Sequence, residues 1–229
     1  MIGSHLMPAT SRSRLAAAAA LTLAAALALT ACGSSTAHHQ NEGQAVVSQA
    51  ADNSPYKGTE LSDPFTKPDL VLTDTRGKQF DLRKQTDGRT MLLFFGYSNC
   101  PDICPTTMGD VAVALKKQPQ QVRDKTQVVF VTTDPERDTP AKLGSWLKGF
   151  DKTFIGLSGD LPQVKKAALG VGISVEDPKK HHDGTVTSDH GAQVLAFTPD
   201  GKGRVVYTSG TTVEDFANDL PLLAKGTRT

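Results

Sequence analysis

The chain has 229 residues, with 25 Lys and Arg against 24 Asp and Glu, and a formal net charge of +1 at pH 7. This length and a hydrophobic fraction of 38% suit one globular domain with additional segments. Binding to phosphate backbones requires a concentrated excess of Lys and Arg, so we expect no nucleic-acid partner.

The N-terminal segment has the pattern of an export signal. Arg12 and Arg14 precede an Ala/Leu-rich run from Leu15 to Thr30, which is shorter than the ~20 residues that a membrane-spanning helix needs. The run closes in Leu-Thr-Ala-Cys32, which resembles the lipobox of bacterial lipoproteins. We therefore expect residues 1–32 to be a lipoprotein signal ending at a lipidated Cys32. Two acyl chains would then anchor the protein at the extracytoplasmic face of the bacterial cell membrane. The alternative is a secreted protein with an incidental cysteine.

Two further regions follow this signal. Residues 33–67 are rich in Ser, Ala, Gln, Asn and Gly with little apolar periodicity, which predicts a flexible tether. Past Pro68, short apolar runs alternate with amphipathic ones, so we expect residues 68–229 to form the folded domain.

The folded region begins with a predicted β-hairpin formed by Asp69 to Thr73 and Gln79 to Leu82 around an Arg-Gly-Lys turn. The apolar run Thr90 to Tyr97 predicts a buried central strand, and helical spacing follows over Cys104 to Lys117. Further strands are expected at Gln127 to Thr133, Phe154 to Leu157, Ile173 to Val175, Val194 to Thr198 and Arg204 to Tyr207. Further helices are expected from the N-cap Thr139 and Pro140 to Phe150, at Pro162 to Leu169, and at Val213 to Ala224.

This alternation predicts an α/β domain of three layers, with the strands buried between helices. Ligands of such sheets bind beyond the carboxyl ends of the strands. The loop after Tyr97, the turn at Asp134 and the segment before Val194 all fall at that edge.

If Cys32 is lipidated, the two remaining cysteines are Cys100 and Cys104. They close too short a loop to restrict much chain entropy, so a structural disulfide is a poor explanation for them. A helix N-terminus stabilises a thiolate, so Cys104 is expected to ionise readily. Asp102, between the two sulfurs, disfavours a second thiolate unless a cation offsets the charge, which favours metal binding. Thiolates select copper(I), zinc or iron-sulfur clusters, and a structural zinc site requires four protein ligands where only two cysteines remain.

A third ligand is expected among the histidines. His190 is set immediately before a predicted buried strand, where a sheet edge would fix its position. On spacing alone, a hydrogen bond from its ring to nearby backbone is an equally good explanation. His181 and His182 lie in a polar loop and can bind at most a weak second ion, and His38 and His39 lie in the tether.

Three segments carry a resemblance to a known family. These are Gly96 to Pro105 (GYSNCPDICP), Val131 to Pro140 (VTTDPERDTP), and Asp189-His190 ahead of a strand that ends in Pro-Asp-Gly. In this order they closely resemble the Sco (SenC) family, and the resemblance covers Pro68 to Ala224. The chain departs mildly from the pattern, because Ser98-Asn99 stands where many relatives have Thr-His.

The resemblance implies a thioredoxin-like, three-layer α/β/α sandwich with an N-terminal β-hairpin. It also implies copper, as Cu(I) and Cu(II), held by Cys100, Cys104 and His190. Such a metallochaperone delivers copper to, or prepares, the binuclear copper site of cytochrome c oxidase subunit II. Asp134 is then expected to orient the ligand loop, although it can equally cap its Asp-Pro turn. Arg137 and Asp138 can simply pair with each other.

Other functions stay open. The protein could instead be a thiol-disulfide oxidoreductase that keeps the cysteines of that copper site, or of its metallochaperones, reduced. Against this, the cysteines of this chain have the spacing C-x-x-x-C, whereas thioredoxin-type oxidoreductases use C-x-x-C. A peroxiredoxin-like peroxidase is disfavoured because the loop lacks Pro-x-x-x-Thr-x-x-Cys. A binding module with a permanent Cys100–Cys104 disulfide is a further alternative. We therefore favour a carrier over an enzyme, with another extracytoplasmic copper chaperone or a thiol reductant as additional partners.

Overall fold

The computed structural model describes residues 54–226. Its strands are β1 (Thr59–Thr66), β2 (Val71–Asp74), β3 (Gln79–Asp81), β4 (Thr90–Gly96), β5 (Thr126–Thr132), β6 (Ile155–Ser158), β7 (Lys179–Lys180), β8 (Val186–Thr187), β9 (Val194–Phe197) and β10 (Lys202–Tyr207). Its helices are α1 (Leu82–Gln85), α2 (Ile103–Lys116), α3 (Gln120–Lys125), α4 (Pro140–Lys148), α5 (Leu161–Leu169) and α6 (Val213–Lys225). No helix within this range is long and apolar enough to cross a bilayer.

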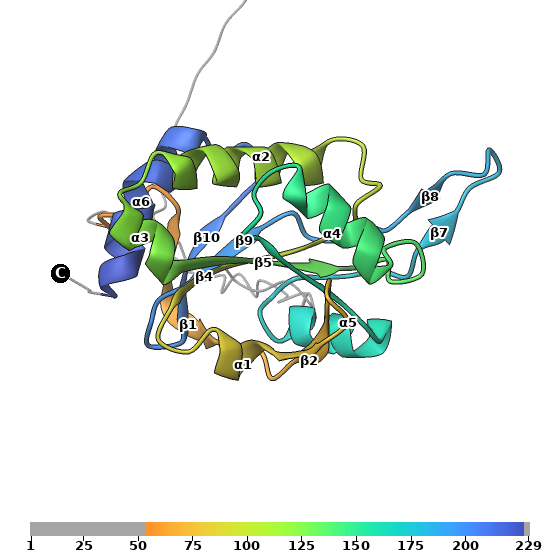
Figure 1. The fold of residues 1–229 in the computed structure, drawn as a ribbon, viewed down its shortest axis with the longest axis horizontal. Helices are drawn as coiled ribbons and strands as arrows, with labels where there is room; N and C mark the ends of the chain where they lie inside the picture. Colours follow the sequence, from red (N-terminus) through yellow and green to blue (C-terminus); the bar gives the residue numbers. More distant parts are fainter. Residues whose placement is uncertain (1–53, 227–229) are drawn as a thin grey trace, which may run out of the picture. The chain divides into compact units, whose positions relative to one another are not determined.

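One sheet of eight strands organises the domain, in the order β1-β10-β9-β4-β5-β6-β2-β3. At its centre, β4 pairs parallel with β5 and antiparallel with β9. Helices α2, α3, α4 and α6 lie on one face of the sheet, and α1 and α5 lie on the other (Figure 1). The three-layer α/β/α sandwich predicted from the sequence is therefore confirmed.

The central strand β4 is buried along its whole length. Leu92 and Phe94 belong to the core under α2, α4 and α6, whereas Met91, Leu93 and Phe95 belong to the core on the opposite face. Side chains alternate between the faces of a sheet, so a strand covered on both faces is apolar throughout. This strand presents its carboxyl end, and the loop that follows it, at one edge of the sheet.

Several local predictions are confirmed, and one is wrong. The hairpin β2–β3 forms around Gly77, whose φ of 77° suits glycine, and Thr139 caps α4 with Pro140 in its first turn. The strand expected at Ile173 to Val175 is absent, because only a single bridge joins Val175 to His190. Ile173 and Val175 are nevertheless buried, so the apolar pattern indicated burial rather than strand pairing.

Strand β1 lies within the region expected to be a tether, and the folded domain therefore starts earlier than residue 68. It occupies the edge of the sheet and pairs antiparallel with β10. Asp63-Pro64 falls where the register between β1 and β10 shifts, and proline is tolerated at such an edge position. Cys32, the signal sequence and the upstream part of the expected tether lie outside the described residues.

A buried carboxylate fixes the start of β1. Asp219 of α6 is fully buried, and it accepts hydrogen bonds from the backbone N–H groups of Lys57 and Gly58 at 2.8 and 2.9 Å. The hydroxyl of Tyr207 donates to the same carboxylate at 3.0 Å. Through the paired registers of β10 and β9, Thr59 at the beginning of β1 lies level with Leu93 in the middle of β4.

Candidate metal centre

The two thiols lie in the loop between β4 and α2. Cys100 is held by a hydrogen bond from its N–H to the carbonyl of Tyr97, at 3.1 Å, and its side chain is partly buried. Cys104 lies in the first turn of α2 and is fully buried. Its backbone N–H donates to the sulfur of Cys100 at 3.5 Å, and the two sulfurs are not joined by a disulfide. The sequence therefore predicted correctly that one thiol lies in a loop and the other at a helix N-terminus.

The missing side chain of Gly96 makes room for the sulfur of Cys104. A Cβ at this position would lie 2.9 Å from that sulfur, 2.8 Å from the ring of Phe94 and 3.0 Å from the ring of Phe130. All three distances are shorter than normal van der Waals contacts between such atoms. Gly96 is therefore required by the position of the buried thiol.

His190 lies beside the buried thiol, with its Nε2 3.7 Å from the sulfur of Cys104. Its Nδ1 lies 3.0 Å from the carbonyl oxygen of Gly191, and because a carbonyl only accepts hydrogen bonds, Nδ1 carries the proton. In the neutral imidazole, Nε2 then presents its lone pair to the thiols. The rings of Phe94 and Tyr97 pack edge-on against the imidazole, with centroids 5.9 and 6.0 Å away.

The chemistry of these donors fits a soft metal ion. Two sulfurs and one neutral imidazole nitrogen are the ligands that copper(I) prefers. In zinc sites with such donors, bonds of about 2.3 Å to sulfur and about 2.0 Å to nitrogen separate the donor atoms by roughly 3.5–4 Å. Cys104 and His190 meet this requirement. Within residues 54–226, no three His, Cys, Asp or Glu side chains are already arranged as a complete ligand set.

The two thiols differ strongly in acidity, in the opposite sense to the sequence prediction. A hydrogen bond from the Cys104 thiol, helped by the N–H groups of Cys104 and Asp102 and by His190, lowers the pKa of Cys100 to about 5 although burial opposes this. The pKa of Cys104 is raised, because its proton is held by Cys100 and because the sulfur is buried. The expectation that Cys104 ionises readily is therefore wrong, since the helix N-terminus is outweighed by these two effects.

Asp138 fixes the thiol loop. Its fully buried carboxylate accepts hydrogen bonds from the N–H of Ser98 at 2.9 Å, from the Ser98 hydroxyl, and from the Thr132 hydroxyl at 2.6 Å. This role of Asp138 was not predicted, because the neighbouring Arg137 suggested a simple ion pair. The only signal in the sequence was the position of Asp138 within the second family segment, since Ser98 is 40 residues away.

Asp134, the residue expected to orient the ligand loop, is buried and forms an ion pair with Arg137. Its backbone N–H donates to the hydroxyl of Thr132 at 3.0 Å. The described hydrogen bonds of Asp134 do not include either thiol or His190. The carboxylate of Asp134 therefore reaches the site through Arg137, and its backbone N–H reaches the thiol loop through Thr132 and Asp138.

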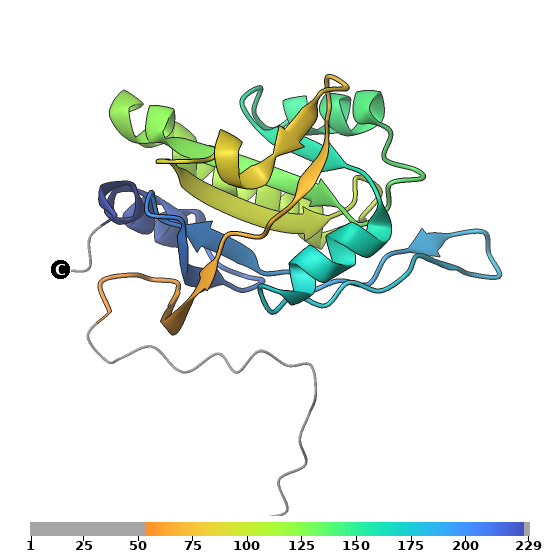
Figure 2. The same ribbon diagram turned by 90° about the horizontal axis from the view of Figure 1, so that it is seen from below.

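The other described histidines lie apart from the thiols. His181 and His182 are exposed near the tip of the hairpin β7–β8, which was not predicted and which projects from the domain (Figure 2). The Nε2 of His181 pairs with the hydroxyl of Thr187 at 2.9 Å. The described residues therefore give no support for a second ion at this pair.

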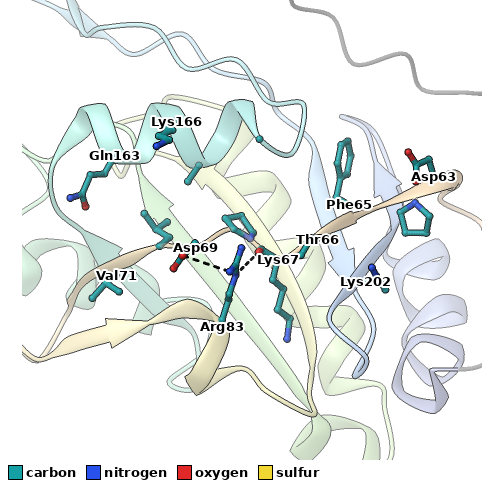
Figure 3. Close-up of a pocket in the computed structure, with 15 residues that line it drawn as sticks. Asp63, Phe65, Thr66, Lys67, Asp69, Val71, Arg83, Gln163, Lys166 and Lys202 are labelled. Atoms are coloured by element: carbon teal, nitrogen blue, oxygen red, sulfur yellow. Dashed lines mark hydrogen bonds and ion pairs between the residues drawn. The ribbon is translucent and has the colours of Figure 1, made fainter.

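A cavity of about 950 Å³ lies away from the thiols, beside α5 and the segment that joins β1 to β2 (Figure 3). Arg83 crosses it, donating to the carbonyl of Lys67 at 2.8 Å and pairing with Asp69 at 3.6 Å. Its lining contains no Cys or His. Because Lys202 begins β10, which runs parallel to β4, this cavity lies toward the amino end of β4, away from the candidate metal centre.

The fold and the site together define a thioredoxin-like domain whose dithiol loop faces a histidine from a later segment. The family model described as SCO1/SenC matches residues 58–225, and the chain belongs to this family. Among curated relatives, a "Putative copper-binding protein" of Stutzerimonas stutzeri is 34% identical over 137 residues, covering 60% of this chain and 66% of that protein. "Protein SCO2, mitochondrial" of Saccharomyces cerevisiae is 32% identical over 157 residues, covering 67% of this chain and 50% of that protein. The chain thus spans about half to two thirds of the length of these relatives.

Solved structures agree with this assignment. The chain is similar to copper-bound ScoI of Bradyrhizobium japonicum, with 33% identity, a TM-score of 0.59, and coverage of 70% of this chain and 97% of that one. It is also similar to apo Sco1 of Thermus thermophilus, with 32% identity, a TM-score of 0.65, and coverage of 73% and 96%. The thioredoxin-like class expected from the sequence is confirmed.

Proposed function

We propose that this protein is a copper carrier that takes up copper as its cargo through Cys100, Cys104 and His190. It serves the binuclear copper site of cytochrome c oxidase subunit II, to which it delivers copper or which it prepares for copper. The observation that carries the proposal is the approach of the His190 Nε2 to the Cys104 sulfur, 3.7 Å apart although the residues are 86 positions apart in the chain. The membership of the SCO1/SenC family and the copper-bound relative support it.

Two thiolates and one neutral imidazole can hold either oxidation state of copper. With Cu(I) the set carries one negative charge, and with Cu(II) it is neutral. Formation of a disulfide between Cys100 and Cys104 would remove two of the three ligands together. The redox state of the dithiol therefore controls uptake and release of the cargo, and copper passes by exchange of ligands to the cysteines of the recipient.

Copper(I) affinity tests this function directly. Reduced protein is titrated with copper(I) against a competing chelator in the absence of oxygen, beside the variants Cys104→Ser and His190→Ala. We expect tight binding by the unmodified protein and at least a tenfold loss in each variant. His181→Ala is the matched control and should bind like the unmodified protein. An unchanged affinity in His190→Ala removes His190 from the site.

A second candidate function, thiol-disulfide exchange, is favoured by the unequal exposure of the two sulfurs. Cys100 is partly exposed and Cys104 is fully buried, which suits one attacking and one resolving thiol. The Cys100 thiolate would attack the partner's disulfide, and the Cys104 sulfur would then displace the partner's sulfur. The chain's dithiol becomes a disulfide, and the partner's disulfide becomes two thiols. Disulfide reduction at full rate by His190→Ala would favour this function over copper carriage.

We further propose that Cys32 carries the lipid that holds the domain at the extracytoplasmic face of the membrane. The supporting feature is the Leu-Thr-Ala-Cys sequence at the end of the apolar run. Cys32→Ser is expected to move the protein from the membrane fraction to the extracytoplasmic soluble fraction. A variant that remains in the membrane fraction contradicts lipid anchoring at this position.

A further inference from the structure

Arg137 contacts three parts of the candidate metal centre at once. Its Nε forms the ion pair with the buried carboxylate of Asp134. Its NH2 group donates to the carbonyl of Val186 at 2.9 Å, in the strand that leads into the segment of His190. Its Cζ lies 5.7 Å from the centre of the Tyr97 ring, within the range of a cation–π contact.

We propose that Arg137 is a positioning residue for copper binding, which sets the orientation of the His190 imidazole through the ring of Tyr97. This inference rests on the proposed function, because it names the residue that prepares the same site. Arg137 does not touch the thiols or the imidazole. Tyr97, which lies between the guanidinium and the imidazole, transmits its effect.

The contacts of Tyr97 explain how the effect reaches the histidine. Tyr97 is 5% exposed, and its ring meets the imidazole of His190 at an interplanar angle of 89°. Its carbonyl also accepts the N–H of Cys100. The guanidinium packed against this ring therefore restricts a side chain that contacts the histidine while its backbone holds the thiol loop.

Contacts other than those of Arg137 already fix the backbone around His190, so a role for Arg137 is confined to the His190 side chain. The Ser188 hydroxyl donates to the Thr133 hydroxyl at 2.7 Å, and His190 pairs with Val175 in a single bridge. What these contacts leave free is the rotation of the imidazole about its side-chain bonds. This rotation is restricted by the hydrogen bond from Nδ1 to the Gly191 carbonyl and by the edge-on rings of Phe94 and Tyr97. Arg137 in turn restricts the ring of Tyr97.

A simpler role for Arg137 would be to neutralise the buried carboxylate of Asp134. The two roles require different properties of the side chain at position 137. Neutralisation needs only a positive charge, which lysine also supplies. Covering an aromatic ring while bonding both a carboxylate and a carbonyl needs the planar, forked guanidinium. The variant Arg137→Lys therefore separates the two roles.

The test compares copper(I) affinity and unfolding by urea in Arg137→Met, Arg137→Lys and Arg204→Met. Arg204 is a matched control, because it pairs with Asp200 at 2.7 Å and its side chain is 15% exposed, but it lies in β10, away from the thiols. We expect both Arg137 variants to bind copper about 10–100-fold more weakly, as for other residues that support metal ligands, and Arg204→Met to bind normally. Full affinity in Arg137→Lys, or equal affinities in Arg137→Met and Arg204→Met, overturns the inference.

Two further measurements keep the test decisive. A double-mutant cycle with Tyr97→Leu should show that the pair Arg137→Met and Tyr97→Leu loses no more affinity than the more damaging single change. Independent losses that multiply would show that Arg137 does not act through Tyr97. The ring resonances of His190 in the metal-free protein should shift in Arg137→Met and stay in Arg204→Met. This readout tests Arg137 even if the unmodified protein binds no copper, a result that would refute only the proposed function; unchanged His190 resonances refute the positioning role itself.

Discussion

The two segments that supply the candidate ligands are held in different ways. The thiol loop joins a fully buried central strand to a long helix, so its ends are fixed by the core, and Asp138 fixes its middle. The histidine segment follows a two-residue strand of a projecting hairpin and belongs to no strand of the main sheet. It is held by the single backbone bridge between Val175 and His190, and by the side chains of Ser188 and Arg137. One half of the site is therefore built into the core, and the other half is attached to it.

The largest effect is expected on the core side of this comparison. Asp138→Ala leaves the Ser98 N–H, the half-buried Ser98 hydroxyl and the fully buried Thr132 hydroxyl without their acceptor. We expect the free energy of unfolding to fall by about 2–4 kcal/mol, since buried donors lose a charged acceptor. Urea unfolding measures this loss, and Ser98→Ala, which removes only one of the donors, should show a smaller one. A loss no greater than that of Ser98→Ala would mean that the loop is held by its ends alone.

Gly96→Ala tests how tightly the core fixes the buried thiol. The new methyl group would overlap the Cys104 sulfur and the rings of Phe94 and Phe130. Overpacking of this kind lowers the free energy of unfolding by about 1–3 kcal/mol. We expect copper affinity to fall as well, because the sulfur must move. Gly109→Ala is the matched control, because a Cβ there meets nothing within 4 Å. Normal copper binding by Gly96→Ala would show that the site tolerates a displaced sulfur.

Ser188→Ala tests the attached half of the site. It removes the hydrogen bonds from the Ser188 hydroxyl to the hydroxyl and carbonyl of Thr133. We expect a loss of about 1 kcal/mol in unfolding free energy. Copper affinity should fall further than this small change suggests, because the segment of His190 loosens before the core does. Hydrogen exchange of the Gly191 amide, which donates to the carbonyl of Ser174 at 2.9 Å, should accelerate while that of β4 stays slow. Equal acceleration in both would contradict the distinction between the two halves.

The smallest effect is expected at a carboxylate in neither half. Burial would raise the pKa of Asp74, but hydrogen bonds from Lys78 and Arg76 outweigh it and lower that pKa. Because the folded-state pKa is depressed, its contribution to stability is present above the unfolded value of about 3.9 and is lost as pH falls through the folded value. Asp74→Asn should cost about 0.5–1 kcal/mol at pH 7.

The check is urea unfolding from pH 7 down to pH 2, beside copper affinity at pH 7. The difference between Asp74→Asn and the unmodified protein should shrink below about pH 4, where the carboxylate begins to be protonated. Copper affinity should not change. A difference in stability that is independent of pH would show that the charge of Asp74 does not contribute.

The same contrast explains which features the sequence could reveal. β4 and the thiol loop are contiguous, so an apolar run and a Cys-x-x-x-Cys spacing were enough to place them. His190 was placed by its position before β9. The partners of Arg137 and Asp138 were assigned wrongly, because these neighbours in sequence suggested a pair. In the fold, Arg137 bonds the carbonyl of Val186, whereas Asp138 accepts from Ser98.

The strands at the margins of the sheet were the hardest to predict. β1 is polar, contains Asp63-Pro64, and pairs with β10 about 140 positions later in the chain. No local sequence pattern therefore predicts this strand. Ile173 and Val175 have the composition of a strand, but their burial comes from packing in the core beside α5. Apolar residues show which positions are covered, whereas strand pairing depends on neighbours that are distant in sequence.

The attachment of Lys57 and Gly58 to Asp219 has a mechanical consequence. A force applied to the chain upstream of residue 54 would load the buried ring of Tyr56 together with these two amides, and the load would pass into α6. Neither the loop that follows β4 nor the hairpin that precedes His190 lies on that path. The domain can therefore be pulled by its leading end without strain reaching the sulfurs or the imidazole.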